Sequence, residues 1–134
     1  MARVTDRMLI EAARQAREKA YAPYSRFKVG AAVLTQSGRI ITGCNVESAS
    51  YGLTLCAERV AIFKAISEGE LSFKKIAVVT DTDELTPPCG ACRQIIWEFC
   101  GDVPVVMSNL KRRTEREQMR RILPRAFDRR FLNK

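Results

Sequence analysis

Histidine is absent from this chain of 134 residues, and so are long hydrophobic runs. Without histidine, Ser-His-Asp and Cys-His catalysis, histidine general bases and histidine-ligated zinc are all excluded. No run approaches the roughly 18 apolar residues of a membrane-spanning helix. Residues 1–15 also lack the apolar core of a signal peptide. We therefore expect a cytoplasmic protein with no membrane partner.

The composition is that of one globular domain. Hydrophobic residues make up 46% of the chain and charged residues 28%, which excludes a disordered or membrane-embedded chain. At this length we expect a single domain over residues 1–134. The five cysteines, an odd number, favour metal or thiol chemistry over a disulfide framework in a reducing compartment. We interpret the net charge of +8 as a solvated basic surface, and a nucleic-acid footprint is the alternative.

Periodicity and turn residues predict a layered α/β domain. A helix over 6–20, with Asp6 as its N-cap, precedes a hairpin of strands over 27–34 and 39–45. An ordered loop over 45–55 follows. The remaining chain alternates helices and buried strands: helix 56–67, strand 76–80, helix 90–99 and strand 103–107. Alternating elements after an antiparallel hairpin predict an α/β fold with a mixed central sheet.

Three cysteines and one glutamate form the motif that carries chemistry. Cys56 lies two residues before Glu58, and Cys89 and Cys92 follow as a Cys-x-x-Cys pair. Thiolates select zinc, so three thiolates and an adjacent carboxylate predict one zinc ion per chain, with an open position for water and Glu58 as acid and base. Cys56 and Cys89 are expected at helix N-termini, where the helix dipole favours the thiolate.

The geometry and charge of this motif impose two conditions. Residues two apart on a helix point about 200° from one another, so Cys56 and Glu58 can serve one ion only if zinc lies off the N-terminal end of the helix. Three thiolates also leave the site with a negative charge. Arg59 and Arg93 stand beside ligand positions, and we expect their guanidinium groups to offset that charge.

Three other interpretations of the cysteines remain open. A structural four-cysteine zinc site would use Cys44 or Cys100 as the fourth ligand, although we read both as small buried hydrophobes. A thioredoxin-like dithiol would use Cys89 and Cys92 alone. A zinc-stabilised binding module without activity would also need a closed site with four ligands.

Five segments resemble cytidine deaminases of the small homotetrameric type, in the order of that family. They are 24–32 (YSRFKVGAA), 43–52 (GCNVESASYG), 56–59 (CAER), 88–94 (PCGACRQ) and 123–127 (LPRAF). The resemblance implies a three-layer α/β/α sandwich with zinc on Cys56, Cys89 and Cys92. It implies hydrolysis of cytidine or deoxycytidine to the uracil nucleoside and ammonia, with Glu58 as the proton shuttle.

The same resemblance implies the residues that contact a pyrimidine nucleoside. Phe27 packs against the base, Asn45 and Glu47 hold the ribose hydroxyls, and Phe127 reaches a neighbouring subunit's site in a homotetramer with sites at subunit interfaces. Residues two apart in an extended segment face the same way, so Asn45 and Glu47 can act as a pair. The pocket is further shaped by Ala49, Tyr51 and the backbone of Ala57.

The last quarter departs from the family pattern. Residues 111–117 (KRRTERE) fall where the family has its final strand, yet they are almost entirely charged. The strand is either short and at an edge of the sheet, where charges block unwanted pairing, or it is lost. Two rival functions stay open: a blasticidin-type nucleoside antibiotic deaminase, and a nucleic-acid-editing deaminase that uses the basic segment. We do not expect nucleic acid as the partner.

Overall fold

The computed structural model describes residues 3–132, and every helix and strand predicted from the sequence is present in it. Of the described helices, none is both long and apolar enough to cross a membrane. In chain order the elements are α1 (Asp6–Arg17), β1 (Val29–Thr35), β2 (Ile40–Cys44), η1 (Tyr51–Leu53), α2 (Ala57–Ser67), β3 (Phe73–Thr80), α3 (Gly90–Cys100), β4 (Pro104–Asn109), β5 (Thr114–Gln118), α4 (Met119–Ile122) and η2 (Arg129–Phe131).

The five strands form one mixed sheet in the order β2-β1-β3-β4-β5. The β3–β4 pair is parallel and the other three pairs are antiparallel. Val33 of β1 lies opposite both Ile41 of β2 and Ile76 of β3, which sets the register in the middle of the sheet. The predicted mixed sheet is confirmed.

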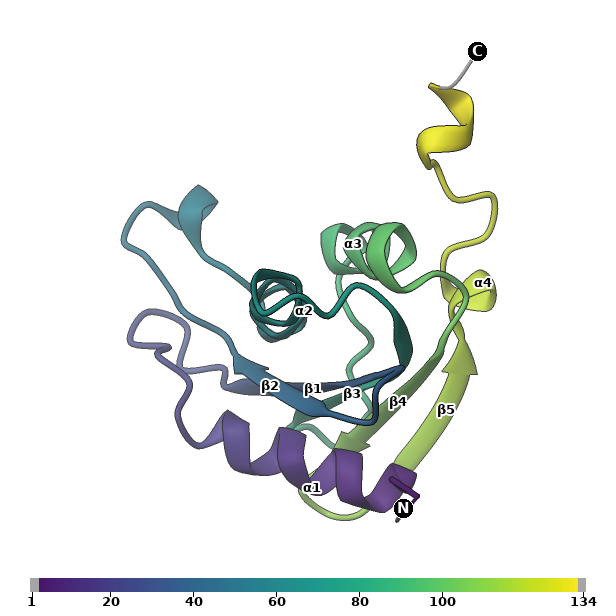
Figure 1. Ribbon diagram of the computed structural model, residues 1–134. Coiled ribbons are helices and arrows are strands. Elements are labelled where there is room, and N and C mark those ends of the chain that lie inside the picture. Colours follow the sequence, from purple (N-terminus) through teal and green to yellow (C-terminus); the bar gives the residue numbers. More distant parts are fainter. Residues whose placement is uncertain (1–2, 133–134) are drawn as a thin grey trace.

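Helices cover both faces of this sheet, with α1 on one side and α2 and α3 on the other (Figure 1). Successive residues of β1 alternate between the two layers. Ala31 and Val33 pack in the core beneath α2 and α3, whereas Ala32 and Leu34 pack in the core that contains Leu9 of α1. Because both faces are buried, the central strands are continuously apolar. The fold is the expected three-layer α/β/α sandwich.

The first helix differs from its prediction at both ends. Thr5, not Asp6, is the N-cap, and its hydroxyl accepts a hydrogen bond from the Met8 N–H at 3.2 Å. The helix ends at Arg17, three residues earlier than predicted. The chain leaves the helix because the Tyr21 N–H donates to the carbonyl of Asn45, and Tyr21 forms an isolated bridge with Val46.

The charged segment near the C-terminus does form a strand. β5 pairs antiparallel with β4 at the edge of the sheet, so the first of the two alternatives for residues 111–117 is correct. Most of its side chains are exposed to solvent. Arg116 pairs with Asp6 at 2.9 Å, and Asp6 also accepts from Lys75 of β3. The strand tolerates its charges because an edge strand exposes them or places them beside an opposite charge.

Gly43 allows α2 to pack close against β2. A Cβ atom at this position would lie 2.5 Å from the backbone nitrogen of Ala61 and 2.7 Å from the carbonyl oxygen of Ala57. Both atoms belong to the backbone of α2 and cannot move aside as a flexible side chain could. The missing side chain of Gly43 therefore sets how closely the N-terminal end of α2 approaches the sheet.

We expect Gly43→Ala to lower the free energy of unfolding by about 1–3 kcal/mol, because overpacking forces the backbone to shift. Gly52→Ala is the matched control, because a Cβ there would meet no atom within 4 Å. Chemical denaturation of both variants measures the difference. Equal stability of Gly43→Ala and the wild type would contradict this account of the packing.

Candidate active site

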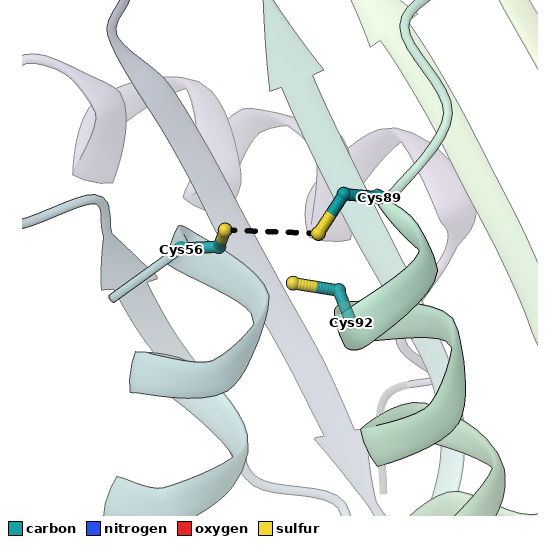
Figure 2. A group of neighbouring side chains, drawn as sticks. All are labelled: Cys56, Cys89 and Cys92. Carbon is teal, nitrogen blue, oxygen red and sulfur yellow. Dashed lines mark hydrogen bonds between the residues drawn. The ribbon is translucent and has the colours of Figure 1, made fainter. Parts of the chain in front are cut away.

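Two helix N-termini meet at one point on the sheet and bring three cysteines together (Figure 2). Cys56 is the N-cap of α2 and Cys89 is the N-cap of α3, both with extended backbone angles. Cys92 lies in the first turn of α3. Cys56 therefore stands outside the helical geometry. Its side chain is thus free of the separation of about 200° that would point Cys56 and Glu58 away from one another within a helix.

The three sulfur atoms are spaced as metal ligands. All lie within 4.8 Å of one another, and the Sγ atoms of Cys56 and Cys89 are 3.9 Å apart. Zinc–sulfur bonds of about 2.3 Å at tetrahedral angles separate neighbouring sulfurs by about 3.8 Å, whereas a disulfide would need about 2.05 Å. The donor set and its spacing therefore fit zinc.

In the described part of the chain, no other cysteine joins this cluster. Among residues 3–132, Cys56, Cys89 and Cys92 form the one group of cysteines and carboxylates close enough to hold a metal ion. Cys44 and Cys100 lie outside it, and burial raises the pKa of the Cys100 thiol to about 12. The four-cysteine interpretation is therefore wrong within the described residues. The thioredoxin-like interpretation uses Cys89 and Cys92 alone. It does not account for Cys56, which lies in the same cluster.

A guanidinium group and a shared proton set the charge of the sulfur cluster. Arg59 Nη2 donates to Cys56 Sγ at 3.4 Å. A hydrogen bond from Cys92, together with Arg59 and against the effect of burial, lowers the pKa of Cys56 to about 5. The same hydrogen bond and then burial raise the pKa of Cys92, which must keep its proton to donate it. Arg59 therefore lies where a cation offsets thiolate charge.

Glu58 is the buried acid beside these sulfurs. It lies in the first turn of α2 and its side chain is only 4% exposed. Burial raises the pKa of Glu58 to about 7, and the negative charge of Cys56 adds to this shift. A carboxyl group with a pKa near neutrality can both accept and donate a proton at physiological pH.

A cavity of about 230 Å³ opens onto Glu58, Cys56 and Cys89, and we call it the catalytic cavity. It brings together residues that are far apart in the sequence, from the 25–29 loop, the loop after β2, the start of α2 and the loop before α3. Its lining consists of Ser25, Phe27, Val29, Asn45, Glu47, Thr54, Leu55, Cys56, Glu58, Val78, Thr80, Thr86, Pro87 and Cys89. The structure thus places Phe27, Asn45 and Glu47 on one cavity with Glu58.

Hydrogen bonds hold Asn45 and Glu47 in place. The Asn45 side chain accepts from the Val29 N–H at 2.8 Å and donates to the Phe27 carbonyl at 2.7 Å. The Glu47 carboxylate accepts from the Tyr24 and Ser25 N–H groups at 3.0 and 3.1 Å, and from the Ser25 hydroxyl. The hydrogen bonds from Ser25 lower the pKa of Glu47. The same contacts fix the loop that carries Phe27.

Four of the residues predicted to contact the nucleoside do not line this cavity. Tyr51 is 74% exposed and faces an adjacent cavity together with Tyr24 and Glu47. Phe127 is 55% exposed and stacks on Phe131 in the C-terminal segment. Ala49 is exposed, and the side chain of Ala57 is buried in the core.

Arg93 is near the ligands but contacts no sulfur. It donates to the carbonyls of Pro88 and Ile122, at 2.8 Å each. Its expected hydrogen bond to a thiolate is therefore replaced by contacts to the backbone on either side of α3. These contacts arise because its guanidinium reaches back along the loop that precedes Cys89.

Sequence reasoning missed several cavity residues, of which Ser25, Thr54, Thr80 and Thr86 are polar. Ser25 has no spacing rule and becomes visible only through its contacts with Glu47. Thr80 could have been found, because it is the last residue of a buried strand in a parallel pair. Ligands of α/β sheets bind beyond the carboxyl ends of such strands.

Fold and site together define a class. A cluster of three sulfurs with a buried carboxylate, open to a cavity on an α/β/α domain, is the arrangement of a metal-assisted hydrolase. The family model of the cytidine and deoxycytidylate deaminase zinc-binding region matches residues 3–108. The chain therefore belongs to the cytidine and deoxycytidylate deaminase family.

Individual relatives agree with this assignment. A cytidine deaminase of Sporosarcina psychrophila is 52% identical over 126 residues, 93% of either chain. A cytidine deaminase of Halalkalibacterium halodurans is 54% identical over 121 residues, 90% of this chain and 92% of its own. The crystal structure of a cytidine deaminase from Burkholderia pseudomallei matches with a TM-score of 0.90 and 50% identity, and covers 92% of this chain and 100% of its own.

A blasticidin-S deaminase of Bacillus cereus is more distant, at 34% identity over 91 residues and 62% of this chain. The rival assignment to a blasticidin-type deaminase therefore has weaker support than the assignment to cytidine deaminases. Thioredoxin-like and purely structural interpretations of the cysteines do not agree with the family assignment.

We expect Cys89→Ala to lose its metal after loading with zinc and dialysis, because two sulfurs cannot replace three. Cys44→Ala and Cys100→Ala are matched controls and keep one zinc per chain. Atomic absorption measures the zinc content. Full zinc in Cys89→Ala would contradict the three-sulfur site, and loss of zinc from either control would restore a fourth sulfur ligand.

Proposed function

We propose that this chain hydrolyses cytidine and deoxycytidine to uridine and deoxyuridine and releases ammonia. The observation that carries the proposal is a cluster of three sulfurs whose members Cys56 and Cys89 line one cavity with the buried Glu58. The single domain expected over 1–134 carries the site, and the reaction belongs to pyrimidine salvage in the cytoplasm.

One zinc ion per chain completes the site, held by Cys56, Cys89 and Cys92. When bound, zinc is a Lewis acid that lowers the pKa of water and so supplies a nucleophile at neutral pH. Arg59 supports this centre directly through its hydrogen bond to Cys56. Arg93 supports it indirectly, because it fixes the carbonyl of Pro88 next to the ligand Cys89.

Glu58 moves the protons of the reaction. Its carboxylate takes a proton from the attacking water and delivers it to N3 of the cytosine ring. It then takes the proton of the new hydroxyl group on C4 and delivers it to the amino group on the same carbon, so the C4 carbonyl forms, the C4–N bond breaks and ammonia leaves. The pKa of about 7 that burial gives Glu58 suits both directions of transfer.

Asn45, Glu47 and Phe27 orient the nucleoside. The Asn45 amide uses one donor and one acceptor on the backbone of residues 27–29, so one N–H and one lone pair remain for the ribose. Ser25 fixes the carboxylate of Glu47. This carboxylate accepts hydrogen bonds from the sugar hydroxyls. Phe27 packs on the base, and the Ala57 backbone at the start of α2 borders the pocket.

The active unit is a homotetramer with sites at subunit interfaces. Phe127 lies on the surface and not on this chain's own catalytic cavity, which agrees with a residue that completes a neighbour's site. Ala49 and Tyr51 are also exposed and lie outside the lining of that cavity. Phe63 and Phe99 add an exposed edge-to-face pair on the outer side of α2 and α3. A solution mass equal to the 15.1 kDa of one chain would contradict the tetramer.

One assay tests the proposed reaction. The ultraviolet absorbance of purified protein is followed with cytidine, deoxycytidine, cytidine monophosphate and blasticidin S, before and after chelation. We expect turnover of the two nucleosides, little of the nucleotide, and loss of activity with the metal. Turnover of blasticidin S alone would favour the antibiotic deaminase. Salt-dependent retention on single-stranded RNA without nucleoside turnover would favour the editing deaminase.

We expect Glu58→Gln to reduce kcat by about 10²–10⁴-fold, because the amide keeps the shape of the side chain but cannot shuttle a proton. Zinc content stays at one per chain, since Glu58 is not a ligand. Glu98→Gln, the same change at an exposed position of α3, is the control and leaves kcat unchanged. Normal turnover by Glu58→Gln would remove Glu58 from the mechanism.

A further inference from the structure

Asn109, the last residue of β4, is a buried polar residue that the proposed mechanism does not use. Its side chain is 6% exposed and does not line the catalytic cavity. Its Nδ2 donates to the carbonyls of Thr82 and Asp83, at 2.8 and 3.4 Å. Its Oδ1 accepts from the N–H groups of Lys111 and Arg113, at 2.9 and 3.0 Å. One amide thus ties two separate loops together.

The first of these loops, residues 81–88, forms part of the catalytic site, and we call it the cavity loop. It follows β3 and leads directly into the ligand Cys89. Thr86 and Pro87 from this loop line the catalytic cavity, together with Thr80 just before it. The position of the cavity loop therefore sets one wall of the cavity and the approach to a metal ligand.

The cavity loop has little backbone support of its own. Within residues 3–132, no backbone-to-backbone hydrogen bond outside the helices and strands involves residues 81–88. Side chains hold it instead: Asn109 binds its start, and Arg93 binds the carbonyl of Pro88 at its end. The ion pair of Lys111 with Asp83 is largely exposed and contributes little.

Thr82 transmits the contact of Asn109 to the cavity wall. Its carbonyl is held by Asn109, and its hydroxyl lies 3.0 Å from the hydroxyl of Thr80 and 3.0 Å from that of Thr86. Thr80 is fixed in β3 and is 1% exposed. A chain of three hydroxyls therefore connects the rigid end of β3, through Thr82, to a residue that faces the substrate space.

We propose that Asn109 is a positioning residue for the deamination reaction. This proposal rests on the proposed function. Through Thr82, Asn109 holds the cavity wall formed by Thr86 and Pro87 in the arrangement that the nucleoside needs. The same contact fixes the course of the loop that leads into Cys89. Loss of this contact frees a segment that lacks backbone hydrogen bonds. Misplacement of a site by about 1 Å can cost about 10²-fold in rate.

Asn109→Asp separates the two halves of the contact. It keeps an oxygen for the N–H groups of Lys111 and Arg113, but replaces the N–H donor with an oxygen that cannot donate to Thr82. We expect kcat/KM for cytidine to fall about 10- to 100-fold, with a raised KM and one zinc per chain. The NMR order parameters of the backbone at residues 81–86 fall, because the loop becomes more mobile.

Ser108→Ala is the matched control. Ser108 is the preceding residue of β4 and is 3% exposed. Its hydroxyl contacts the β4–β5 turn at Arg113 and Thr114 and the main-chain carbonyl of Asn109, but neither the Asn109 amide side chain nor the cavity loop. We expect its kcat/KM to stay within about twofold of the wild type, since the side-chain contacts between Asn109 and the cavity loop remain.

Thr82→Val and Thr82→Ser test the hydroxyl chain independently, including the case in which Asn109→Asp does not fold. Thr82→Val keeps the volume but removes the hydroxyl, so kcat/KM falls and the backbone order parameters of the cavity loop fall as well. Thr82→Ser retains the hydroxyl and restores both.

Two results would overturn the proposal: activity of Asn109→Asp or Thr82→Val within twofold of the wild type, or an equal loss in Ser108→Ala. If the wild type does not deaminate cytidine, the proposed function fails and the loop dynamics decide alone. Lower backbone order parameters at residues 81–86 in Asn109→Asp or Thr82→Val than in Ser108→Ala support the positioning role, and equal order parameters refute it.

Discussion

The convergence of two helix N-termini on one point is the constraint on which the rest of this structure depends. Cys56 and Cys89 are N-caps, so their side chains project past the ends of α2 and α3 toward each other. A small shift of either helix would separate sulfurs that must lie within a few ångströms. Gly43 permits the close approach of α2 to β2. This approach therefore supports the position of the sulfur cluster as well as the packing of the core.

The cavity beside this centre is held by polar side chains that bind backbone groups. Asn45 and Glu47 fix residues 24–29, and Asn109 and Arg93 fix the cavity loop. Irregular segments can form precise sites only when such contacts replace the missing ladder of a helix or strand. Glu58 differs, because a helix positions it and its burial serves to adjust its proton affinity.

The excess of positive charge coexists with the fold because most of it stays at the surface. β5 is charged and forms nonetheless, since an edge strand needs only one partner strand and can expose its side chains. Asp6 of α1 forms ion pairs with Arg116 of β5 and with Lys75 of β3. These ion pairs connect the edge strand to the layer that contains α1. The basic segment therefore requires no nucleic acid to explain its presence.

The sequence alone determined the order of the main helices and strands and the helix starts at Cys56 and Cys89. It also determined the three-cysteine pattern and the family resemblance. Each of these depends on local spacing or on turn residues. Only the tertiary structure decided that Thr5 caps the first helix, that β5 forms, and that Arg93 binds carbonyls rather than sulfur. The same holds for Ser25 and Asn109, whose partners Glu47 and Thr82 lie 22 and 27 residues away. Such contacts have no periodicity, because the packing of loops against a finished sheet, not the spacing of residues along the chain, selects them.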